Sequence, residues 1–205
     1  FTINIVKGLV ILAAAFLDVI RTKLMTRMSI VNGAGEMWTE GRPPLPAGKA
    51  FLHDIVFAGA SVGEKLAQVR TEMERDKADH YMVSAPDSIA WFLNLRGDDV
   101  SYIPVVISYL LISMDSVTWY VDSDKLTDEV RTYLRENDIS VAGYGEVFRD
   151  LGDLPAESSV LVDSLRNSYA VYTAVKHARI LDKGDIIIRL KAVKNPVEIE
   201  NLKET

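Results

Sequence analysis

Cysteine is absent from the 205-residue chain, and histidine occurs only three times. The absence of cysteine excludes disulfide bonds and thiolate chemistry, and it fits a cytoplasmic protein. No two of the histidines, His53, His80 and His177, have the spacing of a metal-binding pair such as H-x-x-x-H. We therefore expect them at the surface or at strand ends, and we expect no metal site in this chain.

Three glycine motifs are also missing: G-x-G-x-x-G, G-x-x-x-x-G-K-[ST] and G-x-S-x-G. Gly143-Tyr144-Gly145 lacks a third glycine and is predicted to be a turn. The net charge of -6 gives no sign of a basic nucleic-acid-binding face. The apolar segment from Ile5 to Ile20 carries Lys7 and Asp18, and the uncharged run between them is shorter than the roughly 20 residues that span a bilayer. It predicts a buried helix and no membrane anchor.

The adjacent acidic residues Asp98 and Asp99 are the strongest candidates in the sequence for a catalytic or metal-binding role. Asp98-Asp99 follows Arg96-Gly97, and the two carboxylates could supply a base or a metal ligand. Solvated turn residues, with Arg96 paired to one of them, are the favoured interpretation. Asp122-Ser123-Asp124 is better explained by turn and helix-cap chemistry before Thr127. The aromatic residues in apolar runs are expected in the core: Trp91, Trp119 and Tyr120.

Helical and strand patterns alternate over most of the chain. A helix is predicted over residues 2–27, with a short strand at 28–31, and the proline-rich stretch after Gly41 predicts an extended linker. Ser61 and Glu64 form a capping box ahead of an apolar stripe that ends at Met73. Further helices are predicted at 88–93, 127–137, 146–151 and 168–177, and strands at 81–83, 105–112, 117–121, 139–141, 159–162 and 180–181. This alternation predicts an α/β fold with a mixed sheet, in which 105–112 and 117–121 form a hairpin.

The last twelve residues have the signature of a helix start. Asn195 suits the N-cap, Pro196 the first helical position and Glu198 the capping-box position. Ile199 and Leu202 begin an apolar stripe. A helix this short is marginal alone, so we expect a piece of a longer protein in which these two side chains have a packing partner.

Several motifs resemble those of the three-domain Xaa-Pro aminopeptidases (aminopeptidase P). The main match runs from Ser88 to Val100 and includes Asn94-Leu95-Arg96-Gly97, with Pro104-Val105 and Ser108-Tyr109 following. Trp38 with the prolines from Arg42 to Pro46 resembles the junction between the first two domains of that family. Phe57 to Leu66 and Lys191 to Ile199 match two further stretches, the second at the entry to the catalytic domain.

The resemblance implies a creatinase/prolidase N-terminal domain with a ribonuclease-H-like mixed sheet and flanking helices, preceded by the tail of a similar first domain. Residues 1–42 would be the C-terminal part of that first domain, 43–50 a proline-rich linker, 51–193 the second domain and 194–205 the start of the catalytic domain. The parent enzyme would remove an N-terminal residue preceding proline, using two divalent metal ions, often manganese, held outside this chain. A peptide substrate and a homodimer would follow for the whole protein.

Within the chain the resemblance implies no catalytic residue and no metal ligand, so the fragment itself is expected to be inactive. Arg96 is the one candidate for a functional contact, with a substrate, a catalytic domain or a second subunit, because its planar guanidinium can hold a carboxylate at two points. Two alternatives remain: a freestanding creatinase-like scaffold or interaction module, and the N-terminal part of another pita-bread hydrolase such as prolidase or creatinase.

Overall fold

The computed structural model describes residues 40–41 and 43–204, and the chain divides into two compact units, residues 1–44 and 45–205. The helix expected at residues 2–27, the strand at 28–31 and the motif residue Trp38 lie outside the described residues. Residues 43–50 have no helix or strand, as their prolines predict. The second unit contains all the helices and strands considered below.

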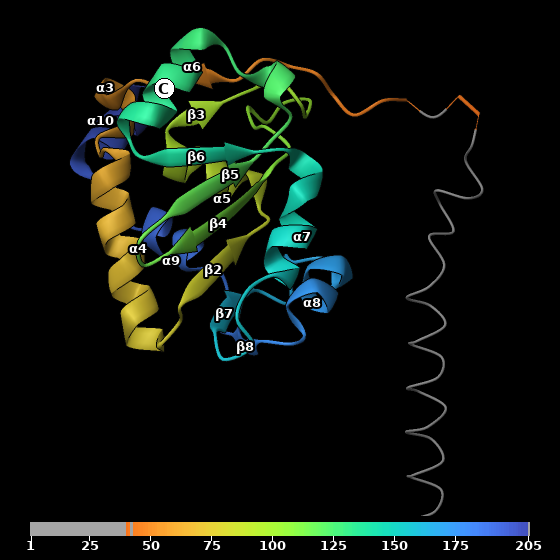
Figure 1. Ribbon diagram of the computed structural model, residues 1–205. Helices are drawn as coiled ribbons and strands as arrows, with labels where there is room; N and C mark the ends of the chain where they lie inside the picture. Colours follow the sequence, from red (N-terminus) through yellow and green to blue (C-terminus); the bar gives the residue numbers. More distant parts are fainter. Residues whose placement is uncertain (1–39, 42, 205) are drawn as a thin grey trace, which may run out of the picture. The chain divides into compact units, whose positions relative to one another are not determined.

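A mixed sheet forms the centre of this unit (Figure 1). Within the described residues it has six strands in the order β6-β5-β4-β2-β7-β8. Only β4 runs antiparallel to its neighbours, and the pairs β5–β6, β2–β7 and β7–β8 are parallel. The strands are β2 (His80–Val83), β4 (Tyr109–Ser113), β5 (Val117–Tyr120), β6 (Ile139–Ala142), β7 (Ser159–Val162) and β8 (Arg179–Asp182). The predicted α/β fold and the β4–β5 hairpin are therefore confirmed.

Helices cover both faces of the sheet. Side chains from α4 (Val62–Asp76), α5 (Pro86–Leu93), α6 (Asp128–Glu136) and α9 (Ile186–Ala192) fill the core on one face. Those from α7 (Val147–Gly152) and α8 (Tyr169–Val175) fill the other. The remaining elements are α3 (Ile55–Ala58), α10 (Pro196–Glu204), the 3₁₀ turns η1 (Ser123–Lys125) and η2 (Tyr144–Glu146), and the two-residue strands β1 (Phe51–Leu52) and β3 (Leu95–Arg96), which pair with each other.

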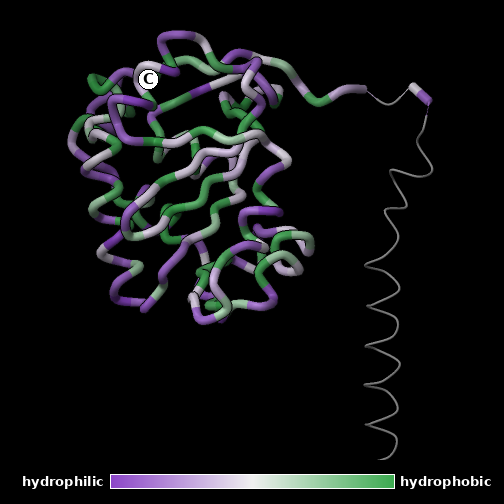
Figure 2. The backbone as a smooth tube through the Cα atoms, viewed as in Figure 1, coloured by the Kyte–Doolittle hydropathy of each residue, from purple (hydrophilic) through white to green (hydrophobic). Residues whose placement is uncertain are grey.

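Alternation along the strands divides the core into these two halves. Tyr81 belongs to the cluster on the α4 side, and its neighbour Met82 to the cluster on the α7 side. Trp119 and Tyr120 divide in the same way, and both are buried as predicted. Successive strand residues point to opposite faces, so a sheet covered on both sides needs apolar residues at every position. Figure 2 shows this hydrophobic content along the central strands.

Helix α4 has the predicted start and the predicted buried face. Ser61 Oγ accepts a hydrogen bond from the Glu64 amide, and a Glu64 carboxylate oxygen accepts one from the Ser61 amide at 2.7 Å. This reciprocal pair satisfies two amides that have no partner inside the helix. On the buried face of α4, the side chains of Val69 and Met73 are fully buried. The same face also buries Lys65, which the apolar pattern did not indicate.

The strand predicted at 105–112 begins only at Tyr109, so its first four residues were assigned wrongly. The reason is local: the preceding loop uses its own backbone groups. The Asp99 amide donates to Val105 O at 3.2 Å, and the Ile107 amide donates to an Asp99 carboxylate oxygen at 2.6 Å. These groups are therefore not available for the sheet ladder.

No helix or strand was predicted at residues 186–192, where the structure has helix α9, and the isoleucine run there favours a strand by intrinsic propensity. Asp185 caps the helix by accepting from the Ile188 amide, and Ile186 and Ile187 are fully buried. The cap and the burial together override the propensity. None of the helices in the described ranges has the length and hydrophobicity needed to cross a bilayer.

Candidate functional site

Arg96, the candidate contact residue, lies in β3 rather than in an open loop. Its Nη1 atom donates to the carbonyl oxygens of Ala90 and Leu95, both at 2.9 Å. Ala90 lies in the last turn of α5, where a cation is favoured by the negative end of the helix dipole. The side chain is half-buried, and burial lowers the pKa of Arg96. These contacts give Arg96 a structural role at the end of α5.

Asp99 is buried, which corrects the expectation of solvated turn acids, and its ion-pair partner is Lys125 rather than Arg96. The two side chains are 0% and 3% exposed respectively. One Asp99 oxygen accepts both from Lys125 Nζ and from the Ile107 amide. The other oxygen is buried without a hydrogen-bond partner among the described residues. Only Asp98 is exposed as expected.

Lys65 and Trp91 form a second polar arrangement, on the side of α5 toward α4. The Lys65 Nζ atom donates to the carbonyl oxygen of Trp91 at 2.7 Å and to the side-chain oxygen of Asn94. It also lies 4.3 Å from the centroid of the Trp91 ring, a cation–π distance. Burial lowers the pKa of Lys65 to about 8. Trp91 itself is half-buried rather than a full core residue, and its indole N–H faces the end of the chain.

Helix α10 supplies the partner for that indole. Glu198 Oε1 accepts from Trp91 Nε1 at 3.0 Å, and Glu198 Oε2 accepts from the Asn195 amide at 3.0 Å. The Glu198 amide in turn donates to Asn195 Oδ1 at 2.9 Å. The capping box predicted at Asn195 and Glu198 is thus confirmed. His53 faces the same group of charges: burial, Arg96 and Lys65 together lower the pKa of His53.

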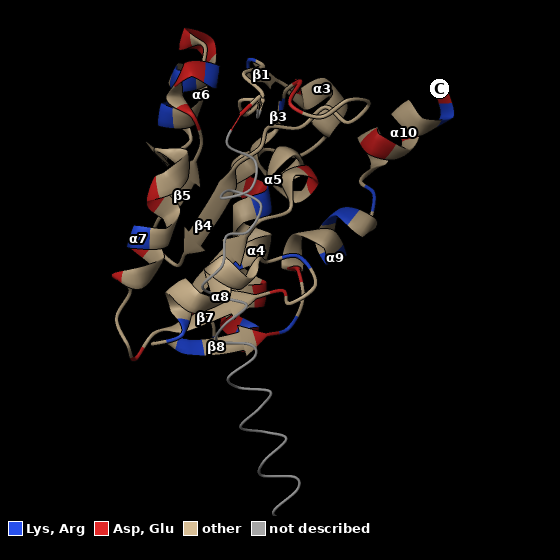
Figure 3. Ribbon diagram, turned by 90° about the vertical axis from the view of Figure 1, so that its right-hand side faces the viewer, with Lys and Arg blue, Asp and Glu red and all other residues tan. Residues whose placement is uncertain are grey.

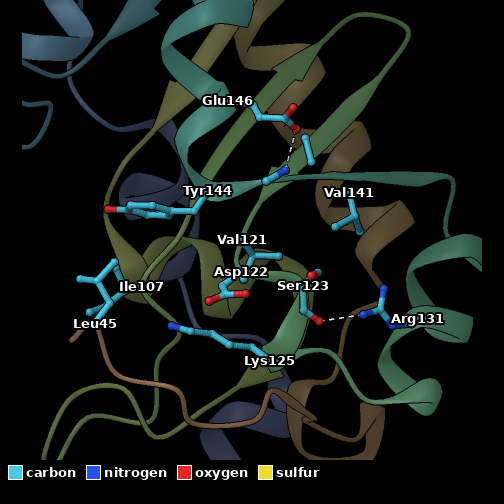
Figure 4. A pocket seen from close by; sticks show the side chains of 12 residues that line it. Leu45, Ile107, Val121, Asp122, Ser123, Lys125, Arg131, Val141, Tyr144 and Glu146 are labelled. Atoms are coloured by element: carbon cyan, nitrogen blue, oxygen red, sulfur yellow. Dashed lines mark hydrogen bonds between the residues drawn. The ribbon is translucent and has the colours of Figure 1, made fainter.

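A cavity of about 500 Å³ lies where β5 and β6 end (Figure 4). Arg131 Nη2 donates to Ser123 O at 2.7 Å, and the Gly143 amide donates to Glu146 at 2.8 Å. The remaining lining side chains are mostly apolar, and the lining Lys125 is already paired with Asp99. Carboxyl ends of parallel strands often hold ligands in α/β folds. Here the lining polar groups make contacts within the chain and form no catalytic arrangement.

The predicted turn and cap residues take their expected places near this cavity. Asp122 caps η1 by accepting from the Asp124 amide at 3.0 Å. Gly143 begins the η2 turn. The histidines are dispersed: His80 begins β2, and His177 is exposed with a contact to Leu154 O at 2.8 Å. Across residues 40–41 and 43–204, no three His, Cys, Asp or Glu side chains gather in a group that could hold a metal ion.

Residues 41–198 match the family model of the creatinase/prolidase N-terminal domain. The chain belongs to this family. The matched residues include the whole six-stranded mixed sheet described above. The sequence motifs from Ser88 to Val100 indicated the same family.

Similarity to individual members confirms the resemblance to aminopeptidase P. The chain is 37% identical over 182 residues to a probable Xaa-Pro aminopeptidase P of Sordaria macrospora, a match that covers 82% of this chain and 29% of that protein. It is 37% identical over 161 residues to Xaa-Pro aminopeptidase 1 of Dictyostelium discoideum, covering 78% of this chain and 26% of that one. The creatinase/prolidase N-terminal domain seen here thus spans less than a third of these relatives.

A solved structure shows the same architecture. The X-prolyl aminopeptidase of Caenorhabditis elegans, described as a cytosolic enzyme with a di-nuclear active site, superposes with a TM-score of 0.79 and 26% sequence identity. That superposition covers 85% of this chain and 29% of the nematode protein. The chain is therefore similar, in sequence and in fold, to Xaa-Pro aminopeptidases over less than a third of their length.

Proposed function

We propose that this chain is the non-catalytic N-terminal region of a metal-dependent aminopeptidase that removes an N-terminal residue preceding proline. The observation that carries the proposal is its similarity, in sequence and in fold, to Xaa-Pro aminopeptidases over most of its length. The contacts of its candidate polar residues support a scaffold role. Arg96 binds backbone carbonyl groups, and Asp99 binds Lys125 and a loop amide.

The proposal assigns residues 1–42 to a first domain, 43–50 to a linker, 51–193 to the second domain and 194–205 to the start of a catalytic domain. Two divalent metal ions, manganese by our proposal, would be bound by that catalytic domain. The di-nuclear site and cytosolic location described for the nematode enzyme support this proposal and a cytoplasmic location. We propose a homodimer as the assembly of the whole enzyme.

The test compares the complete gene product with the 205-residue chain. Both are incubated with Arg-Pro-Pro and with the control peptide Arg-Ala-Pro, after metal removal and again after Mn²⁺ addition. We expect the complete protein with Mn²⁺ to release arginine from Arg-Pro-Pro only, and the 205-residue chain to release none. Arginine release by the purified 205-residue chain would contradict the non-catalytic assignment. A metal-loaded complete protein that cleaves neither peptide would favour the scaffold alternative.

The contact of Arg96 with a substrate or another domain stays a prediction. Arg96→Ala and Arg96→Lys in the complete enzyme test it, with Arg131→Ala as a control, since the exposed Arg131 also binds a carbonyl oxygen. Loss of the α5 contact alone predicts a lower melting temperature with unchanged kcat/KM. A several-fold fall in kcat/KM at unchanged melting temperature would show a functional contact.

A further inference from the structure

Helix α10 attaches to the domain through a small number of polar contacts. Asn195 Nδ2 donates to Ala58 O at 2.8 Å, and Trp91 Nε1 donates to Glu198 at 3.0 Å. The large apolar side chains of the helix contribute less, since Ile199 is 43% exposed and Leu202 is 65% exposed. Figure 1 shows α10 beside α3, and Figure 3 shows it following α9. Its position therefore depends strongly on the groups around Glu198.

Glu198 has two functions at once. Its Oε2 atom closes the capping box at the start of α10, and its Oε1 atom accepts from the indole of Trp91. Behind that indole lies the ammonium group of Lys65, stacked on the ring at 4.3 Å. The hydrogen-bond acceptors of Lys65 are the neutral oxygens of Trp91 and Asn94, and it has no ion pair within the described part of the chain. Burial lowers the pKa of Lys65, and among its charged neighbours the Glu198 carboxylate does most to raise it.

Helix α10 contains the end of the segment that matches the family domain. The match to the family domain ends at Glu198, and the helix continues to Glu204. Helix α10 is thus the element that crosses the end of the N-terminal domain. We propose that Lys65, Trp91 and Glu198 form an electrostatic latch that fixes α10 on the domain, and that the latch loosens when Lys65 loses its proton.

The charges that surround the latch come from several elements. Helix α4 contributes Lys65 and Glu64, β3 contributes Arg96, the segment before α3 contributes His53, and α10 contributes Glu198. Burial lowers the pKa of Lys65 to about 8. His53 is neutral in that range because its pKa is also lowered, while the guanidinium of Arg96 keeps its charge. Raising the pH through this range therefore removes the Lys65 charge and weakens its attraction for Glu198.

Amide hydrogen exchange of the 205-residue chain, measured by mass spectrometry, tests the latch. Glu198→Gln removes the charge and leaves one side-chain oxygen for two N–H donors, Trp91 Nε1 and the Asn195 amide. Glu200→Gln removes an exposed charge from the same helix and serves as the control. A hydrogen bond to a charged acceptor is about 1 kcal/mol stronger than one to a neutral acceptor, so at about pH 7 we expect α10 amides to exchange about fivefold faster in Glu198→Gln. Glu200→Gln should exchange as the wild type does.

The pH dependence separates the role of Lys65 from that of the indole alone. Comparing wild type and Glu198→Gln at one pH cancels the intrinsic change of exchange rate with pH. We expect the rate ratio to fall between about pH 7 and about pH 9.5, where Lys65 is largely neutral, and to stay above one, because Glu198 keeps its charge and both acceptor oxygens at the higher pH. Lys65→Met should give the low ratio at both pH values. If Lys65→Met does not fold, the pH series of the other two proteins still decides the question.

Two results would overturn the latch. Equal α10 exchange in wild type and Glu198→Gln at about pH 7 would show that Glu198 does not hold the helix by its charge. A ratio that stays constant across the pH range would show that Lys65 has no part in it.

Discussion

The buried ion pair between Lys125 and Asp99 gives the sharpest test of how the loop before β4 is held. Lys125→Met replaces the ammonium group with an apolar side chain of similar length, and it leaves the Asp99 carboxylate with the Ile107 amide as its remaining partner. Both side chains of the pair are almost completely buried, at 3% and 0% exposed. Water therefore cannot replace the lost partner.

Removing one member of a buried pair costs about 3–5 kcal/mol, because a charge remains without compensation in a poorly solvated site. We expect Lys125→Met to lower the free energy of unfolding by this amount. Asp99→Asn should also be destabilising, since it leaves the ammonium group unpaired. The double variant has neither charge, so its cost should be smaller than the sum of the two by about 2–4 kcal/mol.

Urea unfolding followed by tryptophan fluorescence measures these differences, since Trp119 is buried in the same core. Lys203→Met is the control, because it breaks an ion pair whose two side chains are 66% and 64% exposed. It should change stability by less than about 1 kcal/mol. A cost below about 1 kcal/mol for Lys125→Met, or strictly additive effects in the double variant, would refute this account of the pair.

Three further predictions concern the backbone and pH. Gly59→Ala should destabilise the chain by about 2 kcal/mol, because Gly59 has φ +66° and an added Cβ would lie 2.3 Å from Asn195 Oδ1; Gly145→Ala, which meets nothing within 4 Å, should be nearly neutral in the same urea titration. Tyr102→Gly should raise the melting temperature, equivalent to about 1 kcal/mol, since this fully exposed tyrosine has φ +69°, whereas Tyr102→Ala keeps the strain and should not. Burial lowers the pKa of His80, so the unfolded chain takes up the proton first and stability should decline as pH falls from about 7 to about 5; His80→Leu should reduce that decline, and an unchanged slope in urea titrations would contradict it.

Local patterns in the sequence predicted local structure well. The capping boxes at Ser61 and Asn195 formed as expected, because each joins groups only three residues apart. The hairpin of β4 and β5 and the alternation of helices with short strands followed from apolar periodicity. The family followed from motifs between Ser88 and Val100, whose order along the chain is itself sequence information.

Tertiary structure decided which polar side chains meet. Lys125 pairs with Asp99 from 26 residues away, and Trp91 reaches Glu198 across 107 residues. In both cases the sequence shows the side chains but not the packing that brings them together. Helix α9 was not predicted for a related reason, since burial of Ile186 and Ile187 depends on neighbours from other elements. Hydrogen bonds within a turn are determined by adjacent residues, whereas contacts between elements are fixed only when the whole sheet is assembled.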